Sequence, residues 1–289
     1  MNQILNRIIV RLPEKLRYFI SFSIYIKRIP NLINPRDYQE YIFKDILFNR
    51  NHKRYLFADK YRVREIVQSK GLGHILPEIY GCWQDADQIQ FDELPGKFII
   101  KTNHSCGFNI ICHNKDKLDQ ELVRRKLNEW LKLKHQVYFE THYHKIKPVV
   151  FCEELIDDKK GFVPIDYKFH CAHGEPVFIL AVNNRFVNGR GGRLLFDTNW
   201  NKLDFIRNKE NEAEAVISRP QNLDKMIEYA RILSAGMNYV RIDLYDTGEK
   251  VYFGEFTLTP LAGILFYYTN EALKYMGDRI RNKKSTLCF

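Results

Sequence analysis

The chain has 289 residues, of which 45% are hydrophobic and 14% aromatic, and this composition excludes a disordered chain. Its length allows one large domain or two to three smaller units. Lysine and arginine outnumber aspartate and glutamate by ten, 45 against 35, so we expect a polyanionic partner, an acidic substrate or an anionic membrane surface.

The cysteines predict neither a metal site nor a disulfide framework. None lies in a C-x-x-C pair, and their spacing does not suit zinc. No apolar run approaches the roughly 20 residues needed to cross a bilayer, and charges interrupt the apolar start of the chain where a signal peptide would lie. We therefore expect a cytoplasmic protein with free thiols at Cys82, Cys106, Cys112, Cys152, Cys171 and Cys288.

Residues 1–55 are predicted to be helical and basic, with breaks at Pro13, Pro30 and Pro35. The first 30 residues interleave arginine and lysine with isoleucine, leucine, phenylalanine and tyrosine. A basic amphipathic segment of this kind fits the inner face of a cell membrane. The alternative is a helix that packs on its own domain.

The middle of the chain alternates between helix and strand signals. Apolar positions at helical spacing follow Asp59 and end at Gly71 and Gly73. The stretch "ILPEIYGCW" and, after a turn at Pro95-Gly96, "KFIIKTN" are predicted strands. A small-residue loop, another strand, an amphipathic helix over 115–133 and the strand "KPVVFCEELI" follow.

The C-terminal half is predicted to contain two long hairpins. The first, "VPIDYKFHCAHGEPVFILAVNNR", turns at His173-Gly174, and a helix over 220–236 separates it from the second, "RIDLYDTGEKVYFGEFTLTP" (241–260). A C-terminal helix completes the chain. Long hairpins beside helices indicate an α+β fold with antiparallel sheets.

The second hairpin carries charged residues inside apolar strands. Alternation places Arg241 and Asp243 on one face. A two-residue turn at Thr247-Gly248 puts Glu255 on the opposite face, whereas a loop of three or five residues brings it beside Asp243. Two neighbouring carboxylates need a cation, supplied by Arg241 or by Mg²⁺ carried with phosphate oxygens. The alternative is a solvated face with a surface ion pair.

Further charged positions suit a triphosphate. Lys101 precedes the small-residue loop of Ser105, Cys106 and Gly107, and Lys60 lies at a helix start, two arrangements that favour phosphate. A surface lysine is the alternative for Lys60. Glu153 and Glu154 end a strand, where one can accept hydrogen bonds from a ribose while the backbone of 153–156 meets an adenine edge, or where both simply reach water. Asp166 and Lys168 share a strand face, and Arg185 follows the next strand.

The ordered motifs "DKYRVRE", "KTNHSCG", "EELI", "DYKF", "RID" and "GEFTLTP" resemble the ATP-grasp superfamily. With "NPRDYQEYIFKD" and "FDTNW" they are most similar to its teichuronopeptide-biosynthesis (TupA-like) branch, over about residues 30–268. The resemblance implies ATP and Mg²⁺ clasped between two antiparallel-sheet subdomains. The expected division is a basic helical region (1–55), a preceding segment (56–95), a small subdomain (96–155) and a large subdomain with the metal site (156–289).

The resemblance also implies roles for individual residues. Lys60 and Lys101 would meet phosphates under the 105–107 loop, and Glu153 or Glu154 would meet the ribose beside an adenine hinge that includes Leu155 and Ile156. Asp243 and Glu255 would hold Mg²⁺, with Thr257 where the superfamily usually has asparagine. Arg241 would stabilise the transferred phosphoryl group, and the further cations assigned to catalysis are Lys168 and Arg185. The bulky "TPLAG" loop departs from the expected glycine-rich form.

The implied reaction is carboxylate–amine ligation through an acylphosphate, attaching an amino acid to a uronic acid of a bacterial surface glycan or lipid-linked glycan. It requires no nucleophilic serine or cysteine. Candidate substrate contacts are His104, Arg190, Arg193, Asp197 and Trp200, with Trp200 alternatively a core residue. The alternatives are a sugar kinase, a glycosyltransferase of capsule or O-antigen synthesis, and a glycan-binding module; no nucleic-acid partner is expected, because the cations lie in apolar strands.

Overall fold

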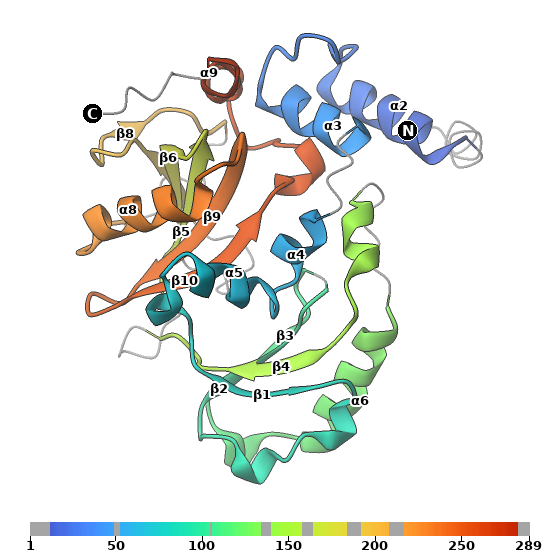
Figure 1. The fold of residues 1–289 in the computed structure, drawn as a ribbon, viewed down its shortest axis with the longest axis vertical. Coiled ribbons are helices and arrows are strands. Elements are labelled where there is room, and N and C mark those ends of the chain that lie inside the picture. The colour runs from blue at the N-terminus through green and yellow to red at the C-terminus, as the bar shows by residue number, and fades with distance from the viewer. Residues whose placement is uncertain are drawn as a thin grey trace.

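The computed structural model describes residues 12–48, 53–104, 106–133, 140–157, 164–183, 192–207 and 217–282. Its two antiparallel sheets face one another across the middle of the molecule (Figure 1). This arrangement confirms the predicted α+β class with two sheets. Three predicted site residues, Ser105, Arg185 and Arg190, lie outside the described residues, as does Cys288.

The larger sheet has six strands in the order β10-β9-β5-β6-β7-β8, all antiparallel. The first predicted hairpin is confirmed, since His173 and Gly174 form its turn with φ of 52° and 85°. The strands are β5 (Asp166–Ala172), β6 (Glu175–Val182), β7 (Arg193–Phe196), β8 (Lys202–Leu203), β9 (Tyr239–Asp246) and β10 (Val251–Thr257).

The two faces of the large sheet have different roles. Phe169 and Ile242 point into an apolar core covered by α8 (Leu223–Ser234). Residues of the opposite face pack at one end against α3 (Tyr38–Phe48) and α9 (Asn270–Arg281). At the other end that face carries charged side chains, including Lys168 and Asp243. Side chains alternate along a strand, so one sequence serves both a core and a polar surface.

The smaller sheet has four strands in the order β1-β4-β2-β3, and α6 (Gln120–Lys132) packs on it through Val123 and Leu127. Its strands are β1 (Ile79–Trp83), β2 (Phe98–Thr102), β3 (Asn109–Cys112) and β4 (Val150–Glu153). β1 precedes residue 95 but forms an edge of this sheet. The expected boundary at 95 is therefore wrong for the small sheet, because pairing with β4 across about 70 residues leaves no local signal.

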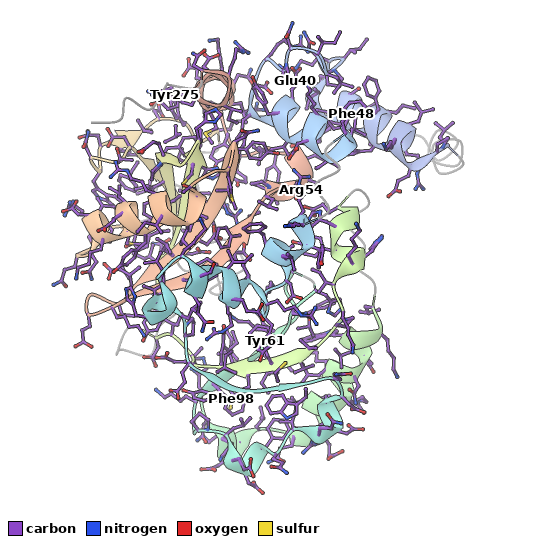
Figure 2. The ribbon with its side chains drawn as sticks, in the orientation of Figure 1. Glu40, Phe48, Arg54, Tyr61, Phe98 and Tyr275 are labelled. Carbon is purple, nitrogen blue, oxygen red and sulfur yellow. The ribbon has the colours of Figure 1, made fainter. Side chains whose placement is uncertain are left out.

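Short helices connect these layers. α4 (Arg54–Ala58) and α5 (Val63–Ser69) run between the two sheets, where Tyr61 contacts Phe151 of β4 (Figure 2). The predicted helix 115–133 is split, because Asp119 caps α6 by accepting a hydrogen bond from the amide of Leu122. The 3₁₀ helices are η1 (Gly73–Ile75), η2 (Ala86–Gln88), η3 (Phe91–Glu93), η4 (Lys115–Lys117), η5 (Thr141–Lys145) and η6 (Pro260–Gly263).

The described part of the N-terminal region is helical, as predicted. α2 (Glu14–Ile26) follows Pro13, and the loop with Pro30 and Pro35 separates it from α3. Phe22 stacks on Phe43 with ring centroids 4.0 Å apart. Through α3 the pair docks on η6 and α9 of the large sheet's layer. None of the helices described has the length and apolar character required to cross a bilayer.

Candidate functional site

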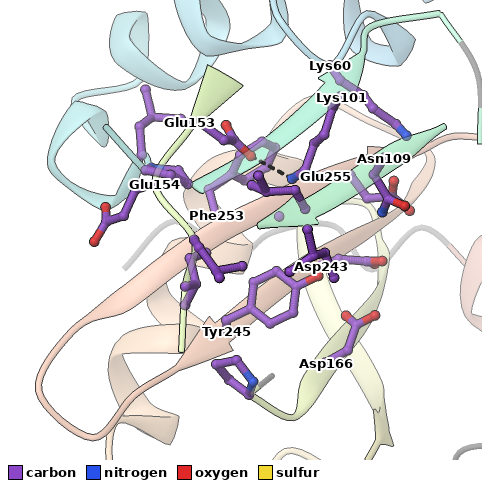
Figure 3. Close-up of a pocket in the computed structure, with 18 of the residues that line it drawn as sticks. Lys60, Lys101, Asn109, Glu153, Glu154, Asp166, Asp243, Tyr245, Phe253 and Glu255 are labelled. Carbon is purple, nitrogen blue, oxygen red and sulfur yellow. Dashed lines mark hydrogen bonds and ion pairs between the residues drawn. The ribbon is translucent and has the colours of Figure 1, made fainter. Parts of the chain in front are cut away.

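A cavity of about 600 Å³ lies between the two sheets (Figure 3). This volume is within the range of small-molecule sites. One part of its wall is apolar and comes mainly from the small sheet and the segment after β4. The apolar lining includes Leu76, Ile99, Ile111, Phe151, Leu155, Ile156 and Phe253. Such a wall suits a flat heterocycle, and the charged residues at the other end of the cavity suit phosphates.

Charged residues of the large sheet form a row behind this cavity. Lys168 lies directly opposite Asp243 across β5 and β9. Its Nζ is 2.5 Å from Asp243 Oδ2 and 2.5 Å from Asp166 Oδ2. Arg241 binds the same carboxylate with two bonds, from Nε to Oδ1 (2.6 Å) and from Nη2 to Oδ2 (2.7 Å). Asp243, 2% exposed, is thus held by two cations.

Glu255 joins the row because β10 bulges. The loop 247–250 has four residues, an even number that alone would place Gly254 opposite Asp243. The register shifts at Gly254, so Glu255 takes that position. Arg241 Nη2 then reaches Glu255 Oε1 at 2.7 Å, and Thr257 Oγ1 donates to the same oxygen at 3.0 Å. The predicted gathering of these carboxylates is present, but a bulge produces it instead of an odd loop.

Among the described residues, the cluster consists of three carboxylates and two cations. Asp166, Asp243 and Glu255 face Lys168 and Arg241. Burial opposes the charge on Arg241, but the adjacent carboxylates of Asp243 and Glu255 outweigh it and raise the pKa of the guanidinium well above its usual value. Arg241 therefore stays protonated throughout the physiological range.

The small sheet and the segment of α4 and α5 contribute cations from the other side of the cavity. Lys101 Nζ is 2.5 Å from Glu153 Oε1, and a dashed line joins this pair in Figure 3. Arg64 Nη1 is 3.6 Å from Glu153 Oε2. Lys60 lines the cavity, with its backbone amide bonded to the carbonyl of Asn103. Glu154 instead accepts a hydrogen bond from the hydroxyl of Tyr252 on β10. Glu153 thus sits beside the lysine at the cavity, whereas Glu154 ties the two sheets together.

The structure brings most predicted site residues to this cavity. Arg241, Lys168 and Thr257 contact its carboxylates. The predicted residues that line it are Lys60, Lys101, Cys106, Gly107, Glu153, Glu154, Leu155, Ile156, Asp243 and Glu255.

Four candidate substrate contacts, His104, Arg193, Asp197 and Trp200, are in the described part of the chain but outside the cavity lining. Asp197 accepts hydrogen bonds within the turn that it begins. Trp200 stacks on Phe196 at 3.9 Å and packs on the core of the large sheet. The structure therefore supports the core alternative for Trp200.

Sequence reasoning missed several residues of the cavity. Arg64, Asn109 and Tyr245 line it, and so does Asp166, which was noted but given no role. The spacing of Asp166 and Lys168 predicts a shared strand face, and this signal was sufficient to predict Asp166 as a residue of the site. Arg64 lies within the motif "DKYRVRE", but only the tertiary structure places it beside Glu153.

A neutral histidine supports the row from the buried side. His170 lies opposite Arg241, and its ring nitrogens contact Tyr38 Oη at 3.3 Å and Tyr268 Oη at 2.7 Å. Burial, with the nearby charges of Arg241 and Lys168, lowers the pKa of His170 well below its usual value. An uncharged imidazole between two hydroxyls avoids placing a third cation beside Arg241 and Lys168.

The residues present fit a magnesium nucleotide. Among the residues described, no group of three or more His, Cys, Asp or Glu side chains is arranged to hold a metal ion by itself. Mg²⁺ does not require such a group, because it is commonly held by one or two carboxylates with phosphates and water. Asp243 and Glu255 supply two carboxylates at the charged end of the cavity, and Lys60 and Lys101 supply cations for phosphates.

Two antiparallel sheets enclose a cavity with Lys101 on one sheet and paired carboxylates on the other, an arrangement that fits an ATP-grasp fold. The sequence profile described as TupA-like ATPgrasp matches residues 39–281. The chain belongs to the TupA-like ATP-grasp family, which confirms the resemblance found in its motifs. The comparison with curated proteins found no match.

Solved structures with a similar fold include D-alanine–D-alanine ligase from Bacillus anthracis, with TM-score 0.47 and 17% identity over 78% of this chain and 66% of that one. The same enzyme complexed with ATP gives TM-score 0.40 and 16% identity over 70% and 54%. The ATP-grasp ligase PsnB complexed with a minimal precursor gives TM-score 0.44 and 13% identity over 81% and 62%. This chain thus spans 54–66% of the length of these three structures.

Proposed function

We propose that this chain is an ATP- and Mg²⁺-dependent carboxylate–amine ligase that forms an amide through an acylphosphate. The observation that carries the proposal is the pairing of Asp243 with Glu255 around Arg241, at the end of a cavity lined on its other side by Lys60 and Lys101. Membership of the TupA-like ATP-grasp family supports the same reaction class.

The nucleotide is proposed to lie with its base against Phe151, Leu155 and Ile156 and its phosphates toward Lys60 and Lys101. β4 ends its pairing at Glu153, and the next residues continue along the cavity wall as irregular backbone. Peptide groups of such a segment can hydrogen-bond the edge of a base. Glu153, held by Lys101 and Arg64, is the proposed ribose contact.

Mg²⁺ held by Asp243 and Glu255 would neutralise phosphate charge. In the proposed reaction, a carboxylate oxygen forms a bond to the γ-phosphorus as the bond to ADP breaks. An amine nitrogen then bonds to the acyl carbon as inorganic phosphate leaves. The chain's own contribution is positioning and charge: Arg241 is proposed to bind the transferred group, and Lys168 holds the Asp243 carboxylate in place through an ion pair. No serine or cysteine nucleophile is needed.

The proposed acceptor is a uronic acid of a bacterial surface glycan, free or lipid-linked, which is joined to an amino acid. The resemblance to the teichuronopeptide branch and the net charge of +10, which suits an acidic substrate, support this choice. His104, Arg190 and Arg193 stay proposed glycan contacts; of these, Arg193 lies on β7 with its guanidinium 5.8 Å from the ring centre of Tyr267.

The test is to incubate the protein with ATP, Mg²⁺, a uronic-acid acceptor and a pool of amino acids. Release of ADP and phosphate together with a new amide supports the ligase, and ADP with a phosphorylated sugar identifies a sugar kinase instead. Absence of ATP turnover contradicts the proposal and favours a glycosyltransferase or a glycan-binding module. Glu255→Gln should lose the amide product, and Glu175→Gln, at an exposed ion pair with Arg231, is the matched control.

A further inference from the structure

α2 has an apolar face turned to solvent as well as one turned to the protein. Tyr18 and Phe22, four residues apart, are buried against α3. Leu16, Ile20 and Ile24 recur at the same spacing on the opposite side, and Leu16 and Ile24 are 45% and 48% exposed. A helix that is apolar on both sides is normally covered on both sides. Something outside the described chain therefore accounts for this second face.

The loop after α2 extends the apolar surface. Ile29 and Ile33 are 75% and 83% exposed. Their backbone is held by polar side chains, since Arg36 donates to the carbonyl of Ile29 at 2.6 Å and Lys44 to the carbonyl of Ile33 at 3.1 Å. The two isoleucines are thus held outward in an ordered loop. We call Leu16, Ile20, Ile24, Ile29 and Ile33 the α2 apolar surface.

Positive charge accompanies this surface. The described residues 12–48 contain six lysines and arginines against four aspartates and glutamates. Asp37 and Glu40 are paired with Arg28 and Arg36, and Asp45 is paired with Arg54. These three carboxylates are therefore neutralised by arginines. Lys15 and Lys27, at the two ends of α2, are exposed.

We propose that the α2 apolar surface docks on an anionic lipid bilayer, with isoleucine and leucine in the interface and lysines on lipid phosphates. Exposed apolar side chains beside lysines are the chemistry of an interfacial helix, and anionic headgroups complement the basic excess. The surface belongs to the N-terminal helices, away from the cavity between the sheets (Figure 1). The inference is therefore independent of the proposed reaction and is tested without ATP.

The experiment is co-sedimentation of the full chain with vesicles of phosphatidylcholine, with or without phosphatidylglycerol. Binding should require phosphatidylglycerol and weaken as salt is raised. The triple variant Leu16→Ser, Ile20→Ser, Ile24→Ser should lower partition by about tenfold or more, because three apolar side chains leave the interface. Lys15→Glu with Lys27→Glu should lose the preference for the anionic lipid. The matched control is Leu122→Ser, a 45% exposed leucine on α6 at the other end of the molecule.

Absence of wild-type binding to the anionic vesicles overturns the proposal, as does equal binding by the triple variant. Light scattering tests whether the surface is instead a contact between two copies. A wild-type dimer that becomes a monomer in the triple variant, with no vesicle binding, also overturns the membrane proposal. Thermal melting checks that the triple variant folds. If it does not fold, Ile29→Ser with Ile33→Ser provides the same test from a loop held by its polar contacts.

Discussion

Glu255 lies directly opposite Asp243 across β10 and β9, and the guanidinium of Arg241 bonds to both carboxylates. This pairing depends on one extra residue in β10, Gly254. Without the bulge, the even loop would turn Glu255 to the core side of the sheet, beside Phe253, and would turn Phe256 to the side of Arg241. A single backbone irregularity thus decides whether the chain has a two-carboxylate site.

Gly254→Ala should weaken both the fold and the site. A Cβ at this position would lie 2.9 Å from Tyr245 Cε2 and 3.0 Å from the carbonyl oxygen of Asp243, so the Tyr245 ring and the Asp243 backbone must shift to make room. We expect a loss of about 1–3 kcal/mol in the free energy of unfolding, measured by urea denaturation, together with lower ATP turnover. Gly96→Ala is the control, because nothing lies within 4 Å of its Cβ. Equal stability of the two variants would contradict this account of the bulge.

The two carboxylates should differ in their effect on stability when they are neutralised. Glu255→Gln and Asp243→Asn should both remove ATP turnover. Asp243 is 2% exposed and bonded to Lys168 and Arg241, so its neutralisation leaves each of these buried cations with a single carboxylate partner and should cost roughly 3 kcal/mol of unfolding free energy. Glu255→Gln should lower the unfolding free energy much less, because 37% of the Glu255 side chain is exposed. Chemical denaturation of both variants measures the difference, and an unchanged Asp243→Asn would show that the pair is not buried as described.

Lys101→Met should weaken nucleotide binding. Lys101 lines the cavity, and the loss of one charge-assisted contact to phosphate is expected to lower ATP affinity about tenfold. Isothermal titration calorimetry with ATP and Mg²⁺ provides the measurement. Lys97→Met is the matched control, since Lys97 precedes the same strand but pairs with Asp157 outside the cavity. Equal losses in the two variants would indicate a general charge effect in place of a phosphate contact.

His170 should make the fold less stable in mild acid. Its pKa is lowered in the folded state by burial and by Arg241 and Lys168, so below about pH 6.5 the unfolded chain binds a proton that the folded chain does not. Stability is then lost as the pH falls, with a slope from this residue of at most about 1.4 kcal/mol per pH unit. Unfolding measured from pH 7.5 to pH 5.5 should be flatter for His170→Gln, and parallel curves would contradict the assignment.

Local sequence patterns predicted those helices and strands whose signal lies in neighbouring residues. Alternating side chains in β5 and β6, and the turn at His173-Gly174, reproduce the first hairpin. The helix predicted at 220–236 is α8. Patterns predicted less well where partners are distant: β1 joins β4 across about 70 residues, and Arg64 reaches Glu153 from a helix. Pairing partners of this kind are chosen by packing, which leaves no periodic trace in the chain.

The sequence by itself determined the class of fold, the family and the residue types of the site, because strand alternation and motif order are properties of neighbouring residues. It left open which face Glu255 would occupy and where Lys168 would point. The tertiary structure decided both. The bulge at Gly254 sets the register of β10, and the pairing of β5 with β9 brings Lys168 to Asp243, 75 residues away. Register and strand order arise from contacts between distant segments, so they become visible only when the chain is folded.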